Sequence, residues 1–169
     1  MGMAPEDFRA LMRNHAGAVT VIAVGKSGTR TGLTATAVCS LSDDPARILI
    51  CVNRSASAHD PIESMRCFSV NLLAIDQADV ANRFAGRAGL EGEDRFADPD
   101  WMTLKTGAPI LVHALASLDC EVAEHQHMET HSIFIENVRD GRSRGNVAPL
   151  VYFDGRFCAL ASDASEPVV

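Results

Sequence analysis

The sequence has 169 residues, of which 47% are hydrophobic and 22% charged, and its formal net charge is -7 at pH 7. These values predict one globular domain over residues 1–169, with a core over about residues 8–160 and a loose tail over 161–169. The acidic balance excludes a broad nucleic-acid-binding surface, and no apolar run approaches the roughly 18 residues of a membrane span.

The start of the chain lacks the basic and apolar regions of a secretory signal. The five cysteines lie far apart in apolar surroundings, and none forms a CxxC pair. Such cysteines are typical of reduced thiols in a reducing compartment. We therefore expect a cytoplasmic protein with neither a membrane nor a nucleic acid as partner.

In the first half of the chain, apolar spacing predicts a helix over residues 5–15, which Gly17 ends. Runs rich in Val, Ile, Thr and small residues predict strands over 18–24, 33–42, 47–53 and 67–73. A short helix is expected from Asp60, with Asp60 as its cap and Pro61 at its first position. A second helix is expected over 76–84. Residues 86–108 read as a long surface loop, and loops of this length tend to cover functional sites.

The last third is predicted to be mostly strand, over residues 114–124, 131–138 and 150–160, with turns at 140–146 and 154–155. Strands dominate, helices are few and connections are short. The fold class is therefore mostly β with a few helices. A closed, Greek-key-like antiparallel barrel with helical caps suits this pattern, because closure removes exposed edges.

Several nucleotide and hydrolase motifs are absent from the sequence. No G-x-G-x-x-G follows a predicted strand, no phosphate-loop signature is present, and no G-x-S-x-G elbow occurs. A nucleotide would therefore bind in a different architecture from the Rossmann or P-loop folds.

The segment T31-G-L-T-A-T-A-V-C-S40 is made of small residues. Small side chains would let a flat aromatic ligand lie against the backbone and receive its hydrogen bonds, with Thr and Ser hydroxyls as further partners. The alternative interpretation is a strand at a crowded barrel seam.

The segment N53-R-S-A-S57 follows a predicted buried strand. Asn53, Ser55 and Ser57 offer neutral donors, and Arg54 offers a bidentate fork that suits a phosphate. An ordinary turn is the alternative.

Histidines gather in E124-H-Q-H-M-E-T-H131. If extended, the segment would place His125, His127, Glu129 and His131 on one face, a plausible zinc or iron ligand set. A turn at Met128–Thr130 between two strands would break that alignment, and we assign no metal ligand. His131 is more attractive as a ring-stacking or proton-handling group, and Tyr152 as a hydrogen-bonding one.

Taken together, these segments resemble the short-chain flavin reductase family, whose members have an FMN-binding split-barrel fold. The resemblance runs from about Phe8 to Leu160. Its anchors are F8-R-A-L-M, G32-L-T-A-T-A-V-C-S, C51-V-N-R-S-A-S, F68-S-V-N-L-L, D76-Q, N82-R-F-A-G, R95-F, G107-A-P-I-L, A116-S-L-D-C, T130-H-S-I-F-I and L150-V-Y-F-D-G-R-F. Each anchor is weak, but their order and spacing are specific, and they favour the ligand-binding interpretation of the first two segments.

The resemblance implies a homodimer that binds FMN or FAD near its subunit interface and uses NADH or NADPH as co-substrate. Matched by position, the residues near the ring and ribityl chain are Thr34, Ala35 and Ser40. Those that hold the flavin chain and phosphate are Asn53, Arg54, Ser55 and Ser57. Arg83, Phe84 and Ala85 would wall the site, and His131 and Tyr152 would lie on the nicotinamide side, His131 as a positioning residue. Family members often have Gly-Asp where this chain has Glu129-Thr130, and some have Gly at Glu136.

The function expected is an NAD(P)H:flavin oxidoreductase that supplies reduced flavin to a partner monooxygenase. One alternative is a flavoprotein that retains FMN and reduces a dedicated acceptor such as a cobalt corrin. A second alternative is a flavin- or haem-binding module without turnover.

Overall fold

The computed structural model describes residues 2–97 and 100–160, and its architecture is mostly β, as the sequence predicts. The predicted tail over 161–169 lies outside the described residues. The helices are α1 (Pro5–Met12), α2 (His59–Met65) and α3 (Ala78–Phe84), with 3-10 turns η1 (Ile75–Gln77) and η2 (Gly92–Phe96). The strands of the main sheet are β2 (Thr20–Val24), β3 (Thr31–Ala35), β4 (Val38–Asp43), β5 (Ala46–Asn53), β6 (Cys67–Leu72), β9 (Ala116–His127) and β10 (His131–Ser143). Five short strands lie outside that sheet: β1 (Gly17–Ala18), β7 (Trp101–Thr103), β8 (Pro109–Leu111), β11 (Val151–Phe153) and β12 (Arg156–Cys158).

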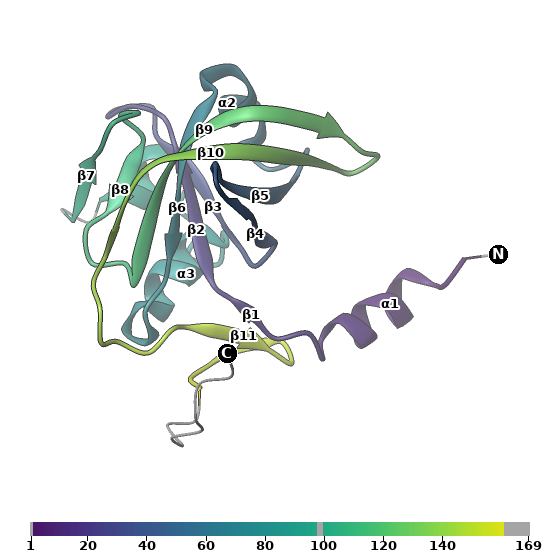
Figure 1. Cartoon of the computed structure of the whole chain (residues 1–169). Helices are drawn as coiled ribbons and strands as arrows, with labels where there is room; N and C mark the ends of the chain where they lie inside the picture. Colours follow the sequence, from purple (N-terminus) through teal and green to yellow (C-terminus); the bar gives the residue numbers. More distant parts are fainter. Residues whose placement is uncertain (1, 98–99, 161–169) are drawn as a thin grey trace.

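The main sheet is antiparallel throughout, with strand order β3-β2-β6-β9-β10-β5-β4. Its two edge strands, β3 and β4, are joined by only Thr36 and Ala37. The chain therefore brings the two edges of the sheet together at that corner and curls the sheet around its core (Figure 1). The small sheet β1-β11-β12 lies below the main sheet, and α1 projects away from the body of the molecule in the same view. No helix among the described residues is long and apolar enough to cross a bilayer.

The core has two parts because β2 is buried on both faces. Ile22 and Val24 point into the interior of the curled sheet, together with Phe68 and Phe134. Val21 and its alternating neighbours face α3 on the other side. A short strand buried on both faces has a continuous apolar sequence, and T20-V-I-A-V follows that pattern.

An aromatic cluster of Phe84, Phe96 and Trp101 covers the outer face of β2 and β3. The Phe84 and Phe96 rings meet edge to face with centroids 5.0 Å apart, and Phe96 lies 4.7 Å from Trp101. This cluster joins α3 to η2 and β7, which lie within the surface loop that the sequence predicts over residues 86–108.

Three expectations need correction. The predicted strand over 33–42 is two strands broken at Thr36 and Ala37, since the chain turns there from one sheet edge to the other. Helix α2 begins at His59 with Ala58 as N-cap, so Asp60 lies in the first turn and does not cap the helix. The expected turn over 140–146 is wrong in its first half, because β10 continues to Ser143, with register shifts after Ile135 and Val138 that keep it paired with β9.

Glu136 is an acidic side chain fully buried inside the curled sheet, on β10 opposite Ile48 of β5 and Val122 of β9. Neither carboxyl oxygen has a hydrogen-bond partner. Burial disfavours the charged form and raises the pKa of Glu136 to about 9. The carboxyl group is therefore neutral at pH 7, and β10 carries it at a cost in stability.

Replacing Glu136 should change how stability depends on pH. Because the folded-state pKa is raised from 4.5 to about 9, the unfolded chain ionises first, and the free energy of unfolding of the wild type falls as pH rises between those values. Glu136→Met should remove this slope and stabilise the fold by about 1–3 kcal/mol at pH 7. Urea unfolding at several pH values measures both effects. Glu124→Met, at an exposed position of β9, is the control and should leave the slope in place.

Candidate functional site

The small-residue segment forms one wall of a cavity at the outer edge of the sheet. Thr34 and Ala35 are half-buried on edge strand β3. They lie beside Ala85 and Tyr152, and the cavity has a volume of about 190 Å³. Its remaining lining residues, which the sequence interpretation missed, are Val19, Thr36, Arg87 and Phe157. Four residues predicted from three separate segments are thus brought together.

The backbone of β3 is the main hydrogen-bonding surface of this cavity. Among the described residues β3 pairs only with β2, so every second N–H and C=O of β3 points to the open edge. The Thr34 hydroxyl is already occupied, since it donates to the Ala81 carbonyl of α3 at 2.7 Å. A flat ligand with donors and acceptors along one edge fits this arrangement, and the fit depends on backbone groups.

Gly32 explains why the strand needs small residues. A Cβ atom at Gly32 would lie 2.5 Å from the Ile22 carbonyl oxygen and 3.0 Å from the Phe84 ring. Phe84 is itself buried behind β3 and does not line the cavity. Of the three residues predicted as a wall, Ala85 lines the cavity, Phe84 supports β3 from behind, and Arg83 is half-buried on α3.

The loop 53–57 follows β5 as predicted, and hydrogen bonds between its own residues hold it in shape. The Asn53 side-chain oxygen accepts from the Ser55 backbone N–H at 2.9 Å and pairs with the Ser55 hydroxyl at 2.8 Å. The Ser57 hydroxyl lies 3.1 Å from that of Thr31, at the start of β3. Arg54 is exposed. The loop therefore abuts one end of β3, while Thr34 and Ala35 lie near the other end, about 10 Å away at the usual rise of a strand.

A second and larger cavity, of about 520 Å³, opens beside Ser57. Its walls are the turn from Gly28 to Thr31 and the segment from Glu91 to Arg95. The Arg95 guanidinium donates to the carbonyl of Gly32 at 2.8 Å, which ties this segment to β3. Part of the predicted surface loop over 86–108 is thus attached to β3, the strand that lines the first cavity.

Glu93 attaches the same segment to Arg30 by more hydrogen bonds than Arg95 makes to Gly32. Its carboxylate accepts from the backbone N–H and the Nε of Arg30, both at 2.8 Å, and pairs with the Arg30 Nη2. These hydrogen bonds lower the pKa of Glu93 to about 2. The Arg30 guanidinium also lies over the Phe96 ring, 4.6 Å from its centroid.

His131 and Tyr152 have different neighbours in the described chain. His131 opens β10 directly opposite Asn53, and its Nδ1 lies 2.8 Å from the Thr130 hydroxyl. Tyr152 lies in the first cavity and meets Phe157 edge to face. The structure places His131 beside the loop 53–57 and Tyr152 beside Thr34 and Ala35.

Ser40 is separated from the other predicted ring-contacting residues. It is exposed on β4 and lines a third cavity, of about 380 Å³, between the chain after α1 and the face of the main sheet. Thr36 lines both this cavity and the first.

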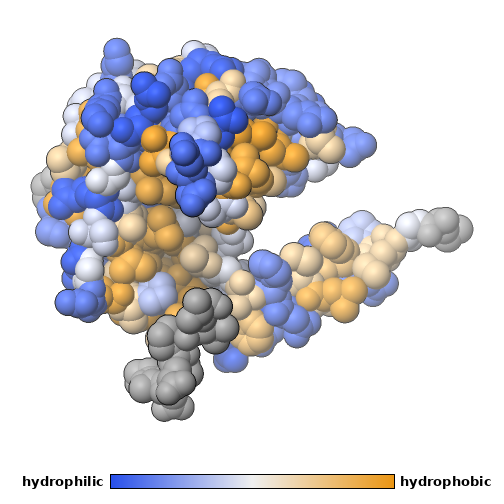
Figure 2. Space-filling view, in the orientation of Figure 1, coloured by the Kyte–Doolittle hydropathy of each residue, from blue (hydrophilic) through white to orange (hydrophobic). Residues whose placement is uncertain are grey.

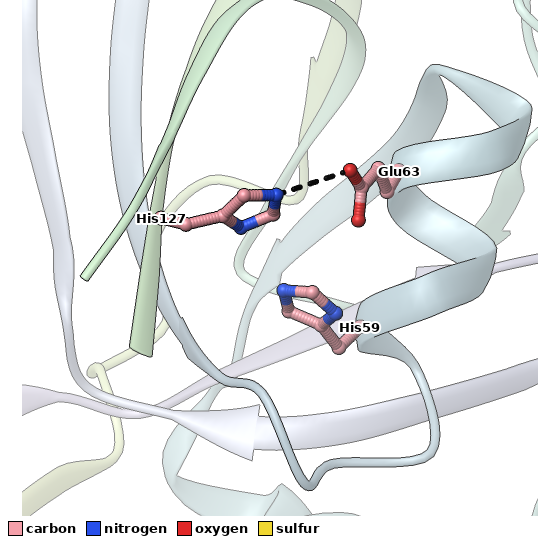
Figure 3. A group of neighbouring side chains, drawn as sticks. All are labelled: His59, Glu63 and His127. Atoms are coloured by element: carbon pink, nitrogen blue, oxygen red, sulfur yellow. Dashed lines mark ion pairs between the residues drawn. The ribbon is translucent and has the colours of Figure 1, made fainter. Parts of the chain in front are cut away.

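The histidine segment folds into a hairpin, with the expected turn at Met128–Thr130. The Met128 N–H donates to the His131 carbonyl at 2.8 Å and closes it. Glu129 and His131 therefore do not join the other two histidines. His125 and His127 instead lie against α2, where each has its Nε2 3.3 Å from the Glu63 carboxylate. Figure 3 shows His127 with Glu63 and His59, an acidic and a basic residue that the sequence interpretation missed. Their i, i+4 spacing on a short helix was the available signal.

Comparisons with known proteins agree on one family. A model of the flavin reductase like domain matches residues 12–161. A Pseudomonas syringae protein named FMN reductase (NADH) RutF is 40% identical over 156 residues, which cover 92% of this chain and 86% of the relative. The solved structure of BorF, the flavin reductase component of a bacterial two-component tryptophan halogenase, aligns with a TM-score of 0.86 and 32% identity, over 93% of this chain and 98% of BorF. Streptomyces globisporus NADH:FAD oxidoreductase SgcE6, in complex with NAD and FAD fragments, aligns with a TM-score of 0.86 and 28% identity over 98% and 99% of the two chains.

Removing the hydrogen bonds between Glu93 and Arg30 should make the segment Glu91–Arg95, here called the covering segment, open more often. Glu93→Gln removes the carboxylate, so we expect amide hydrogen exchange over Gly92–Phe96 to become roughly threefold faster or more at pH 7. In the wild type this added protection should be complete above about pH 4.5 and should be lost progressively as pH falls from there to about 2, because between those two pKa values the carboxylate takes up a proton in the open state but not in the closed one. Glu91→Gln, in the same cavity wall, is the control. Equal exchange rates in both variants would contradict the role of Glu93.

Proposed function

The chain belongs to the flavin reductase like domain family, and on that premise we propose that it uses NADH to reduce FMN and releases the reduced flavin to a partner oxygenase. The observation that carries this proposal is edge strand β3, with a cavity at Thr34 and Ala35 near one end and the Ser57 loop at the other. FMN is chosen over FAD because the relative at 40% identity is named an FMN reductase, and NADH is chosen for the same reason. The partner oxygenase is proposed by analogy with BorF, a component of a two-component system.

The residues present fit a flavin laid along β3. The open-edge backbone groups of β3 would hold the polar edge of the ring, and Ala35 and Ala85 leave room for its face. The distance of about 10 Å from Thr34 to Thr31 suits the span from ring to phosphate. Asn53, Ser55, Ser57 and Arg54 would then receive the phosphate.

A bound flavin supplies the hydride acceptor for the nicotinamide. The task of the protein is to align the two rings and exclude water, for which no general base is required. Tyr152 lies in the first cavity, beside Thr34 and Ala35, and would position the nicotinamide there. His131 is proposed as a second positioning residue, next to the phosphate loop.

We also propose a homodimer, supported by two features. Helix α1 has no buried residue, and its apolar side chains Phe8, Leu11 and Met12 are 57%, 58% and 47% exposed. Figure 2 shows apolar surface both on α1 and on the body of the molecule across the open gap. A lone helix with an exposed apolar stripe is typical of an element that docks on a partner.

The proposal includes a cytoplasmic protein with one domain over residues 1–169, whose core spans about residues 8–160. All five cysteines are free, as suits a reducing compartment.

The first test is NADH oxidation by the purified protein with FMN, with FAD or without added flavin. Saturable turnover that depends on free FMN supports the proposal. A yellow protein that NADH reduces, and that ignores added flavin, would favour a retained cofactor serving a dedicated acceptor such as a cobalt corrin. Absence of oxidation with either flavin would contradict the enzyme and leave a binding module.

Arg54→Ala tests the phosphate loop. Because Arg54 would contact the phosphate, we expect the KM for FMN to rise roughly tenfold, with a small change in kcat. The KM for riboflavin, which lacks the phosphate, should hardly change. Arg139→Ala, at an exposed arginine paired with Glu121, is the control variant. An equal rise in KM for FMN and riboflavin would argue against a phosphate contact.

The double variant Phe8→Asp/Leu11→Asp tests the dimer. Two charges on the apolar stripe of α1 should convert the protein to a monomer in light scattering, and should raise the KM for FMN if the partner completes the site. Met102→Asp, a charge at a 37% exposed apolar residue of β7 on the far side from α1, should leave the oligomeric state unchanged. A monomeric wild type would refute this part of the proposal.

A further inference from the structure

Three side chains with metal-ligating atoms converge beside the β9–β10 hairpin. His59 and Glu63 lie one turn apart on α2, and His127 ends β9. One ligand atom from each lies within 4.8 Å of the others (Figure 3). We propose that His59, Glu63 and His127 form a Zn²⁺ site, separate from the flavin site and independent of the proposed function.

The hydrogen bonds around His59, Glu63 and His127 leave one unprotonated ring nitrogen, the Nε2 of His127, facing the Glu63 carboxylate. His59 Nδ1 donates to Asp60 at 2.8 Å, because a carboxylate can only accept. With His59 neutral, its Nε2 must accept from the Ser132 hydroxyl, at 2.8 Å. Ser132 in turn accepts from His127 Nδ1, also at 2.8 Å. The Nε2 lone pair of His127 then points at Glu63, 3.3 Å away.

Two lone pairs at that distance repel each other unless a cation lies between them. The cation is either a proton on His127, which gives a simple ion pair, or a metal ion. An ion pair accounts for Glu63 and His127 alone. It does not explain why His59, whose side chain is only 4% exposed, also has a ligand atom within 4.8 Å of both. Three donors converging from two elements suit a metal ion better than a proton.

Each proposed ligand also has an outer partner that orients it. Asp60 holds His59 and Ser132 holds His127, in each case through Nδ1. The Nε2 of His127 is thereby left for the metal, whereas the Nε2 of His59 would exchange its hydrogen bond from the Ser132 hydroxyl for the metal. His125 lies 3.3 Å from Glu63, and Arg66 approaches the Nδ1 of His125 at 3.3 Å. Because Nδ1 faces the Arg66 donor, the proton of His125 is on Nε2, where it donates to Glu63. Ligating residues in zinc sites usually have such partners.

The donor set indicates zinc. Two imidazole nitrogens and one carboxylate oxygen are ligands that Zn²⁺ binds tetrahedrally, with a fourth position for water. Donors about 2.1 Å from the metal lie roughly 3.4 Å apart, so the widest pair needs to close by about 1.4 Å at most. Glu63 and His127 can move, since their side chains are 35% and 42% exposed, and they leave an entry path for the ion. Arg66 is the opposing charge, and its guanidinium is already engaged by His125 and by the Val122 and Ala123 carbonyls.

The test uses the full chain without an affinity tag, stripped by a chelator and titrated with Zn²⁺ against a chromophoric competitor. We expect one ion per chain. Glu63→Gln and His127→Gln, both at partly exposed positions, should each weaken zinc binding at least about 100-fold, and His125→Gln about tenfold. His113→Gln should change nothing, since among the described residues His113 pairs with one carboxylate, that of Asp100, at 3.5 Å. Zinc should raise the Tm of the wild type and of His113→Gln, but not of the ligand variants.

Co²⁺ reports which atoms bind the ion. Nitrogen and oxygen ligands should give weak visible bands without the strong near-ultraviolet band of a thiolate. Retention of stoichiometric binding in both Glu63→Gln and His127→Gln would overturn the proposal. A thiolate band would also overturn it, by assigning the ion to the cysteines. Wild-type affinity no higher than that of Glu63→Gln would show a simple ion pair.

Discussion

The close approach of β3 to the elements behind it is the constraint on which the candidate site depends. Gly32 leaves no room for a Cβ atom between the Ile22 carbonyl and the Phe84 ring. The hydrogen bond from Thr34 to Ala81 then fixes α3 against the same strand. An edge strand held this firmly from behind can offer its outward backbone groups in one geometry, which is the preorganisation that a loosely held ligand needs. The aromatic cluster provides the rigid backing because it fills the space between α3 and the covering segment.

The register of β5 against β10 has a comparable effect at the other end of the molecule. It places Asn53 opposite His131, and the Thr130 carbonyl accepts from the Arg54 N–H at 2.9 Å. The loop 53–57 and the hairpin turn at Met128–Thr130 are therefore held together directly. The same register turns Ser132 inward between His59 and His127. A slip of one residue would turn Ser132 and Phe134 to the opposite face, so the buried Phe134 ring protects the arrangement of the polar groups.

The sequence predicted the elements of this fold better than the way in which they meet. Alternating or continuous apolar runs located β2, β5 and β6, since burial in a sheet leaves a local pattern. The break at Thr36 and the extension of β10 to Ser143 leave no such pattern, because they depend on which strand lies next to them. The resemblance located Thr34, Ala35, Ala85 and Tyr152, which the structure brings to one cavity. It could not locate the cluster at His59, because that cluster needs α2 to meet β9, a contact between distant segments.

The size of the first cavity links the proposed dimer to the proposed chemistry. A volume of about 190 Å³ is below the roughly 300–1,000 Å³ usual for pockets that bury most of a small ligand. One chain would therefore cover only part of a flavin ring bound there, and the exposed stripe of α1 offers a means by which a second chain would cover more. The Ser40 cavity has Ile48 and Leu118 in its wall and opens beside the chain that follows α1, so it suits an apolar side chain of a partner. A site assembled from two chains but open on one side holds its ligand by fewer contacts than a closed pocket does. Weak retention is what an enzyme requires if the flavin is a substrate that must leave after reduction.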